Sequence, residues 1–92
     1  MRAQGRKARP PEVEYRAAFG RAVRARREQT EISQEELALR IGMSRRYLAG
    51  IERGESNPSL DQVLRIAIGL DIEVADLLPS RRQRTATRPT GR

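Results

Sequence analysis

Two short helices and the tight turn that joins them are encoded in one segment near the middle of the chain. Ser33 and Ser44 each precede an amphipathic stretch of eight or nine residues, and a serine at that position caps the first free backbone N–H groups of a helix. The first stretch also has the S-x-x-E spacing of a capping box. Gly42 separates the two stretches, and glycine adopts the left-handed conformation of a helix end at little cost. The segment therefore predicts helices over residues 34–41 and 45–53.

The residue types inside this segment fit two helices that cross steeply at close range. Such a crossing needs a small side chain where the helices touch, and Ala38 supplies it. It also needs apolar inner faces, which consist of Leu37, Ile41, Met43, Leu48 and Ile51. This is the arrangement of a helix-turn-helix motif. An ordinary antiparallel helix pair in a small bundle would use similar residues, and it is the alternative.

Helix signals continue on both sides of the motif. A first helix is expected over residues 13–29, and Ser59, with Gln62 in the capping-box position, begins another. The apolar stripe predicted for that helix consists of Leu60, Val63, Leu64, Ala67 and Ile68. A short last helix is expected over residues 74–78. Because no segment alternates apolar and polar residues as a strand does, the predicted fold class is all-α, with five short helices.

The charge of the chain is distributed unevenly. The formal net charge is +7, but residues 1–27 carry nine basic and two acidic side chains, residues 28–78 carry five and ten, and residues 79–92 carry five and none. A net positive charge indicates an anionic partner, and the acidic middle favours a defined docking face over uniform coating of nucleic acid. Residues 1–11 and 79–92, rich in Arg, Gly and Pro, are predicted to be flexible basic tails, which leaves residues 12–78 as one domain.

The composition argues against an enzyme and against a metal site. The chain contains neither cysteine nor histidine, the residues that most zinc sites and most nucleophile–base pairs require. We therefore expect no catalytic residues, no metal and no cofactor. No apolar run approaches the roughly 18 residues of a membrane helix, and no apolar stretch of a secretory signal follows the charged N-terminus. These features predict a cytoplasmic protein with no membrane partner.

A family resemblance is carried by the run SQEELALRIGMSRRYLAGIERGESNPSLDQVLRIAIGLDIEVADLL. It resembles the Cro/Xre-type helix-turn-helix family of phage repressors and bacterial regulators over about residues 17–78, and most specifically in S-Q-E-E-L-A, the G-x-S turn, I-E-R-G and N-P-S-L. The piece R-x-Y-L-x-G-I-E-R is also similar to the controller proteins of restriction–modification systems, a subgroup that binds as dimers. The resemblance implies a five-helix, phage-repressor-like domain whose third helix enters the major groove of DNA.

The resemblance also implies roles for three residues. Gln34, the first residue of the predicted second helix, resembles the family's glutamine that binds a DNA phosphate and braces the third helix. Arg27 and Glu52 match the positions of an ion pair that links the first helix to the third. A solvated pair of little energetic value is the alternative for those two residues.

The rotation of about 100° per residue orients the predicted third helix. With Leu48, Ile51 and Glu52 on the inward side, the expected DNA-contacting residues, including Gln34 from the second helix, are Gln34, Ser44, Arg45, Arg46, Tyr47, Ala49, Gly50 and Arg53. Because a guanidinium matches the edge of guanine with two hydrogen bonds, Arg45 and Arg46 are the expected base readers and Arg53 a phosphate contact. Tyr47 is expected either to touch DNA or to pack in the core. Gly50 either lets DNA approach closely or is merely tolerated.

The leading functional hypothesis is a transcriptional regulator that binds double-stranded DNA as a homodimer. Such dimers place their recognition helices about 34 Å apart on pseudo-palindromic sites. The predicted self-association surface is Ile72, Val74, Leu77 and Leu78, with the last layer of the core as the alternative role of these residues. The alternative function is an antitoxin, which binds a toxin partner as well as its own promoter.

Overall fold

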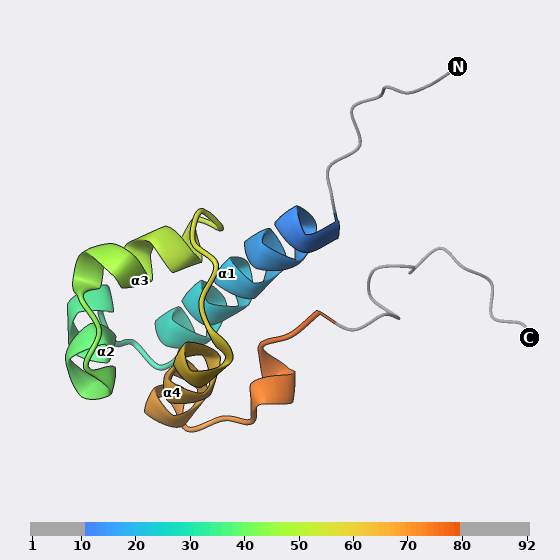
Figure 1. Ribbon diagram of the computed structural model, residues 1–92. Helices are drawn as coiled ribbons and strands as arrows, with labels where there is room; N and C mark the ends of the chain where they lie inside the picture. The colour runs from blue at the N-terminus through green and yellow to red at the C-terminus, as the bar shows by residue number, and fades with distance from the viewer. Residues whose placement is uncertain (1–10, 80–92) are drawn as a thin grey trace, which may run out of the picture.

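Four α-helices and one turn of 3-10 helix succeed one another in the computed structural model, which describes residues 11–79 (Figure 1). The elements are α1 (Pro11–Gln29), α2 (Gln34–Ile41), α3 (Arg45–Glu52), α4 (Leu60–Leu70) and η2 (Val74–Asp76). No strand occurs within the described residues, so the predicted all-α class is confirmed. The prediction of a fifth α-helix is wrong: the few residues between the end of α4 and Pro79 form only a 3-10 turn. No described helix is both long and apolar enough to cross a membrane.

The first helix begins two residues earlier than predicted, at Pro11. Proline is favoured in the first turn of a helix because its missing N–H would have no partner there. Glu12 and Glu14 in the first turn, and Arg26 and Arg27 in the last, complement the helix dipole. Pro11 therefore belongs to α1 rather than to the predicted arm. The rest of that arm, and nearly all of the predicted C-terminal tail, lie outside the described residues.

Serine caps define the starts of the next three helices, as predicted. The hydroxyl oxygens of Ser33, Ser44 and Ser59 accept hydrogen bonds from the third backbone N–H of their helices at 2.9, 3.0 and 3.1 Å. A reciprocal capping box forms at Ser59, whereas the carboxylate of Glu36 accepts a hydrogen bond from an arginine one turn later. Gly42 has the expected left-handed backbone, with a φ of 66°. The local signals in the sequence therefore set these helix ends.

The core lies between helices that are neighbours in space but not always in sequence. α3 packs against both α1 and α2, while α4 packs against α2 and carries η2 beside it (Figure 1). The buried apolar set is Phe19, Val23, Leu37, Ala38, Ile41, Leu48, Ile51, Ile66, Ala67, Leu70 and Leu77. Four of the five predicted inner-face residues of the motif belong to this set, and Met43 packs against it. Burial of this apolar surface holds α3 in a fixed position on the domain.

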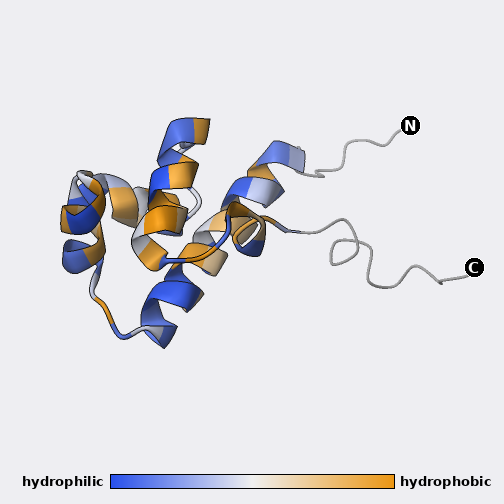
Figure 2. Ribbon diagram, turned by 90° about the horizontal axis from the view of Figure 1, so that it is seen from below, coloured by the Kyte–Doolittle hydropathy of each residue, from blue (hydrophilic) through white to orange (hydrophobic). Residues whose placement is uncertain are grey.

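The buried face of α4 differs from the predicted stripe. Val63 and Ala67 of the predicted stripe do face the core, together with Ile66 and Leu70, whereas Leu60, Leu64 and Ile68 are 80%, 49% and 67% exposed. Both sets have helical spacing, because the apolar residues of α4 spread over a wide arc of the helix. Figure 2 shows from below how apolar and polar residues alternate along the helices. Contact with α2 decides which side is buried, and it leaves Leu60, Leu64 and Ile68 as an exposed row, the α4 stripe.

α1 and α3 cross so closely at Gly20 that no side chain fits between them. A Cβ atom at Gly20 would meet the backbone carbonyl oxygens of Ile51 and Glu52, the latter at 2.7 Å. Gly69 similarly lets α4 approach α2, because a Cβ there would overlap the side chain of Ile41. The sequence pattern assigned the close crossing to Ala38, which is buried, and did not identify the two glycines. Glycine is unfavourable inside a helix, so its presence at these two helical positions was the sequence signal that could have indicated close crossings.

Replacing Gly20 with alanine is expected to lower the free energy of unfolding by about 2 kcal/mol, because two backbone carbonyls must shift to admit the methyl group. Gly50→Ala is the matched control, since its Cβ would meet only the side-chain oxygen of Ser56, at 2.9 Å. That oxygen can rotate away, so we expect a change within about 1 kcal/mol. Urea unfolding monitored by circular dichroism measures both values. Equal stability of the two variants would show that the α1–α3 crossing tolerates a side chain.

Candidate nucleic-acid interface

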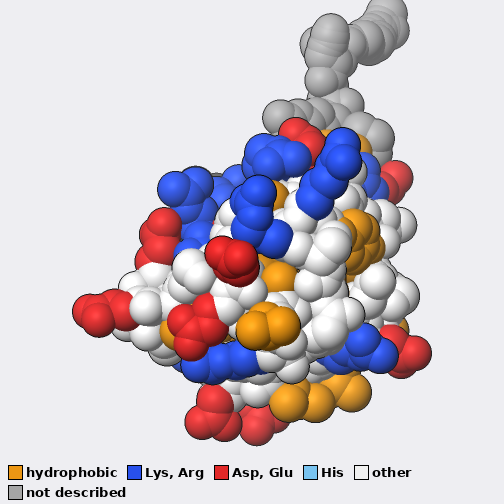
Figure 3. All heavy atoms as spheres, turned by 90° about the vertical axis from the view of Figure 1, so that its left-hand side faces the viewer, with side chains coloured by type: hydrophobic (Ala, Val, Ile, Leu, Met, Phe, Trp, Pro, Cys, Tyr) orange, Lys and Arg blue, Asp and Glu red, His pale blue; other side chains and the backbone are white. Residues whose placement is uncertain are grey.

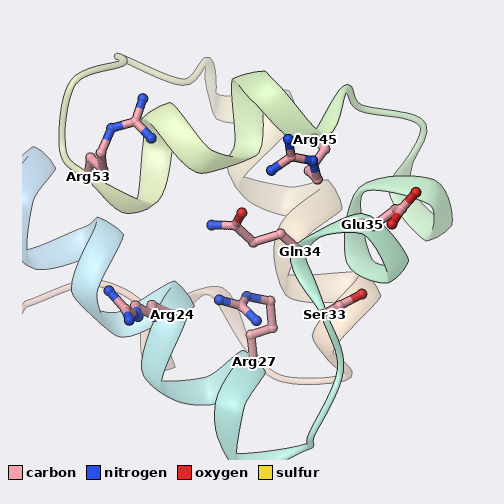
Figure 4. Close-up of a pocket in the computed structure, with 7 residues that line it drawn as sticks. All are labelled: Arg24, Arg27, Ser33, Gln34, Glu35, Arg45 and Arg53. Carbon is pink, nitrogen blue, oxygen red and sulfur yellow. The ribbon is translucent and has the colours of Figure 1, made fainter.

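An open cleft lies where α1, the start of α2 and α3 meet. It is lined by Arg24, Arg27, Ser33, Gln34, Glu35, Arg45 and Arg53 (Figure 4). Four of these seven residues are arginines, contributed by two helices that are far apart in the sequence. Basic side chains also gather on the upper part of the face that carries α2 and α3 (Figure 3). This part of the surface is therefore positively charged, although the middle of the chain is acidic overall.

Arg27, which lines this cleft, belongs to a buried ion pair. Arg27 donates to both carboxylate oxygens of Glu52, from Nε at 2.8 Å and from Nη2 at 3.0 Å, and the two side chains are 11% and 3% exposed. The Nη1 group donates to the carbonyl of Ile32 at 2.9 Å. The hydrogen bond with Glu52 raises the pKa of Arg27 even though burial lowers it. The two residues therefore connect α1 to α3 through a buried ion pair. The alternative expectation, a solvated pair of little energetic value, does not apply to them.

Gln34 extends this network to α2. Its Nε2 donates to Oε1 of Glu52 at 2.9 Å, so the first residue of α2 braces α3 directly. Figure 4 shows its side chain reaching into the space between α1 and α3. One carboxylate thus accepts three hydrogen bonds from two other helices, and these bonds offset the cost of removing its charge from water.

The N-terminal end of α3 presents two arginines to solvent. Arg45 and Arg46 are exposed, and neither enters a salt bridge or a side-chain hydrogen bond among residues 11–79. Ser44 lies beside them, with its hydroxyl committed to the cap of α3. These guanidinium groups are available to an external acceptor on a helix whose other side is fixed in the core.

The prediction that Ala49 and Gly50 point outward is wrong. Ala49 is 8% exposed, and Gly50 is buried beneath the loop that follows α3. The backbone N–H of Glu55 donates to the carbonyl of Gly50 at 2.9 Å, and the hydroxyl oxygen of Ser56 would lie 2.9 Å from a Cβ atom at Gly50. The inward arc of α3 is wider than a helical wheel suggests because α1, α2 and this loop all cover it. Gly50 therefore accommodates a loop of its own chain.

Tyr47 takes the second of its two expected roles. Its half-buried ring packs against the core, and its hydroxyl donates to Oε1 of Gln62 at 2.9 Å. The same oxygen accepts the backbone N–H of Ser59 at 2.9 Å. Tyr47 therefore connects α3 to the capped start of α4 and does not project freely from the surface.

Two other arginines of the cleft are paired with exposed carboxylates. Arg53, the C-cap of α3, lies 3.0 Å from Glu55, and Arg24 on α1 lies 3.0 Å from Glu28. The hydrogen bond from Arg53 lowers the pKa of Glu55, and the hydrogen bond to Glu55 raises the pKa of Arg53. Arg24 was not among the predicted site residues. The signal that could have found it is its spacing, one helical turn before Arg27 on the same side of α1.

Most of the residues predicted for self-association pack in the core of the domain. Leu77 is 1% exposed, and Ile72 and Val74 pack against the core, which leaves Leu78 as the exposed member at 48%. The alternative role, the last core layer, describes three of these four residues.

Nowhere within residues 11–79 do acidic side chains form a group of three that could hold a metal ion.

Comparison with known proteins identifies relatives of the described domain. The model of the Helix-turn-helix family matches residues 23–77. Control protein C.BamHI of Bacillus amyloliquefaciens is 41% identical over 64 residues, which is 68% of this chain and 79% of the relative. The immunity repressor protein of Bacillus phage phi105 is 37% identical over 59 residues, which is 64% of this chain and 41% of the repressor. These relatives are regulators rather than enzymes, which agrees with the prediction of a chain without catalytic residues.

Solved structures extend the same likeness to three dimensions. The restriction-modification controller protein C.AhdI from Aeromonas hydrophila superposes with a TM-score of 0.66 and 42% identity, covering 67% of this chain and 94% of the controller. A hypothetical transcription factor, NHTF, from Neisseria superposes with a TM-score of 0.71 and 29% identity, covering 90% of this chain and 95% of that protein. The arrangement of α1 to α4 is thus similar to that of known helix-turn-helix regulators.

Replacing Arg27 with methionine is expected to lower the free energy of unfolding by about 3–5 kcal/mol, because it leaves the Glu52 carboxylate buried without its main partner. The double variant R27M/E52M is expected to recover a large part of this loss, since apolar residues can replace a buried ion pair. Arg24→Met serves as the control, because its pair with Glu28 is more than half exposed and contributes at most about 1 kcal/mol. Thermal and urea unfolding test this order. A double variant no more stable than R27M would contradict it.

Proposed function

Because the chain belongs to the helix-turn-helix family, we propose that it is a transcriptional regulator that binds double-stranded DNA in a sequence-specific manner. In this proposal α3 enters the major groove, and the protein acts in the cytoplasm where bacterial and phage DNA is transcribed. The observation that carries the proposal is the pair of exposed, unpaired arginines at the start of a helix whose other side is fixed by the core and by Glu52.

Base reading is assigned to Arg45 and Arg46. Each guanidinium can donate two hydrogen bonds to O6 and N7 of guanine, and each such contact discriminates against a wrong base by roughly 1–3 kcal/mol. Ala49 and Gly50 are left out of this role because they are buried, and Tyr47 is left out because its hydroxyl is engaged with Gln62. Readout therefore depends on the N-terminal turn of α3.

The start of α2 is assigned to the DNA backbone. Gln34 donates one amide hydrogen to Glu52, and the second hydrogen of that amide remains for a phosphate. The free N–H groups at the N-terminus of α2 and the dipole of the helix favour the same anion. Ser44, at the cap of α3, is placed to lie near the backbone on the other side of the turn. These contacts position the protein, whereas Arg45 and Arg46 specify the sequence.

The exposed apolar surface of α4 supports a homodimer, which would bind a pseudo-palindromic operator. The α4 stripe, Leu60, Leu64 and Ile68, exposes three large apolar side chains in a row, and such rows on a small protein mark interaction surfaces. A dimer formed through this surface would have to place its two copies of α3 about 34 Å apart to reach successive major grooves on one face of DNA. The α4 stripe, together with exposed Leu78, replaces the mostly buried set predicted from the sequence.

The controller subgroup is the favoured biological setting. C.BamHI is named a control protein, and C.AhdI is named a restriction-modification controller protein. This similarity favours control of restriction–modification genes over an antitoxin role with a toxin partner. The genes beside the coding sequence would distinguish the two roles. A neighbouring restriction–methylation pair would support the controller role, and a neighbouring toxin gene would support the antitoxin role.

Replacing Arg45 and Arg46 with alanine is expected to remove sequence discrimination while leaving the fold intact, because both side chains are exposed and unpaired. The duplex is first selected by the wild-type protein from a random pool at a stated salt concentration. The ratio of affinities for that duplex and for a scrambled one should then fall at least about 30-fold, by the loss of two base contacts.

The charge-matched control is R81A/R82A, which removes two arginines outside the predicted motif. It removes the same charge from outside α3, so any loss of affinity is expected to be equal for both duplexes, because general attraction to phosphate carries no sequence information. An unchanged affinity ratio for R45A/R46A, with an intact helical spectrum, would refute the assignment of α3 as the reading helix.

Replacing Leu64 with glutamate is expected to convert the dimer into a monomer, because it places a charge in the middle of the α4 stripe. Leu39→Glu is the matched control, since Leu39 is 83% exposed on α2, outside the stripe, and should leave the dimer unchanged. Sedimentation equilibrium gives the mass of each variant. If wild type and L64E have the same mass, the α4 stripe is not the dimer interface.

A further inference from the structure

We propose that one phosphate of the DNA backbone sits in the cleft between α1 and α3, and that Arg24 of α1 is one of the groups that bind it. This inference rests on the proposed DNA-binding function and adds to it a contact from outside the helix-turn-helix motif. It starts from the lining of the cleft, in which arginines from α1 and from α3 surround Gln34 (Figure 4).

The charge of the cleft is suited to a single anion. Arg27 is neutralised by buried Glu52, Arg45 has no paired carboxylate among the described residues, and Arg24 and Arg53 are paired only with exposed carboxylates. Glu35 is the one carboxylate among the lining residues, and its side chain points away from the arginines (Figure 4). An anion in this space would therefore meet guanidinium groups from two walls and the amide of Gln34 between them.

Arg24 and Arg53 are held at the cleft by contacts that a phosphate can replace. Each lies 3.0 Å from a carboxylate on the same stretch of chain, Glu28 or Glu55, and all four side chains are 56–64% exposed. Exposed ion pairs of this kind are weak. A phosphate can accept two parallel hydrogen bonds from one guanidinium group, which is a stronger and more specific contact. When DNA binds, each of these two arginines would thus exchange its carboxylate acceptor for a phosphate oxygen.

Arg27 is excluded from this exchange by its own hydrogen bonds. Its Nε and Nη2 groups are committed to Glu52, and Nη1 donates to the carbonyl of Ile32. Arg27 therefore keeps α1 at a fixed distance from α3 while Arg24, one turn earlier, is free to change partners. The two arginines have separate roles, with Arg27 positioning the helix and Arg24 binding the ligand.

The test compares Arg24→Gln with Arg40→Gln. Arg40 is the matched control because it also belongs to an exposed i,i+4 pair, with Glu36 at 3.2 Å, but it does not line the cleft. Affinity for a mixed-sequence duplex is measured over a range of salt concentrations. Loss of one phosphate contact should reduce the slope of log K against log salt by about 0.9 and weaken binding to every sequence alike. R40Q should keep the wild-type slope.

The opposing carboxylate supplies a second measurement. Glu28→Gln removes the competitor of the phosphate, so it should tighten binding more than Glu36→Gln, which removes the same charge on α2. A slope for R24Q equal to that of R40Q, or equal effects of E28Q and E36Q, would overturn the role of Arg24 and leave the proposed function standing. If the wild-type protein binds no duplex even at low salt, the proposed function fails, and this inference fails with it.

Discussion

The buried carboxylate of Glu52 is the group on which the arrangement of the first three helices depends. It lies on α3 and accepts two hydrogen bonds from Arg27 on α1 and one from Gln34 on α2. An unpaired charge at this depth would be strongly destabilising, so loss of the partner that neutralises it would weaken the whole arrangement. Around this network the helices approach closely, and Gly20 lets the backbone of α1 nearly touch that of α3.

This packing divides α3 into two functional parts. Its C-terminal half, from Ala49 to Glu52, is buried against α1, α2 and the following loop, whereas Arg45 and Arg46 at its start are exposed. A binding helix needs both properties, because side chains that read DNA must be accessible and yet held in a fixed orientation. Tyr47 adds a link from α3 to the start of α4, so the proposed reading helix and the α4 stripe belong to one rigid unit.

Local signals in the sequence were sufficient for most of the fold. The serine caps, Gly42 and the apolar spacing of α2 predicted the helix-turn-helix with correct bounds for α2, because these effects act within one or two turns of a helix. Predictions that depended on which face of a helix meets a neighbour were less accurate. Leu60, Leu64 and Ile68 are exposed rather than buried, and Ala49 and Gly50 are buried rather than exposed.

The sequence by itself therefore determined the starts of α2, α3 and α4 through their serine caps, the end of α2 at Gly42, the all-α class and the family of the chain. Only the tertiary structure decided which side of α4 is buried, that the loop after α3 covers Gly50, and that Arg24 and Arg53 lie at the same cleft. The reason is that helical periodicity defines the faces of a helix but not their partners. Partners are chosen by packing between segments distant in the chain, and that choice brings arginines from two helices together on a domain whose middle is acidic.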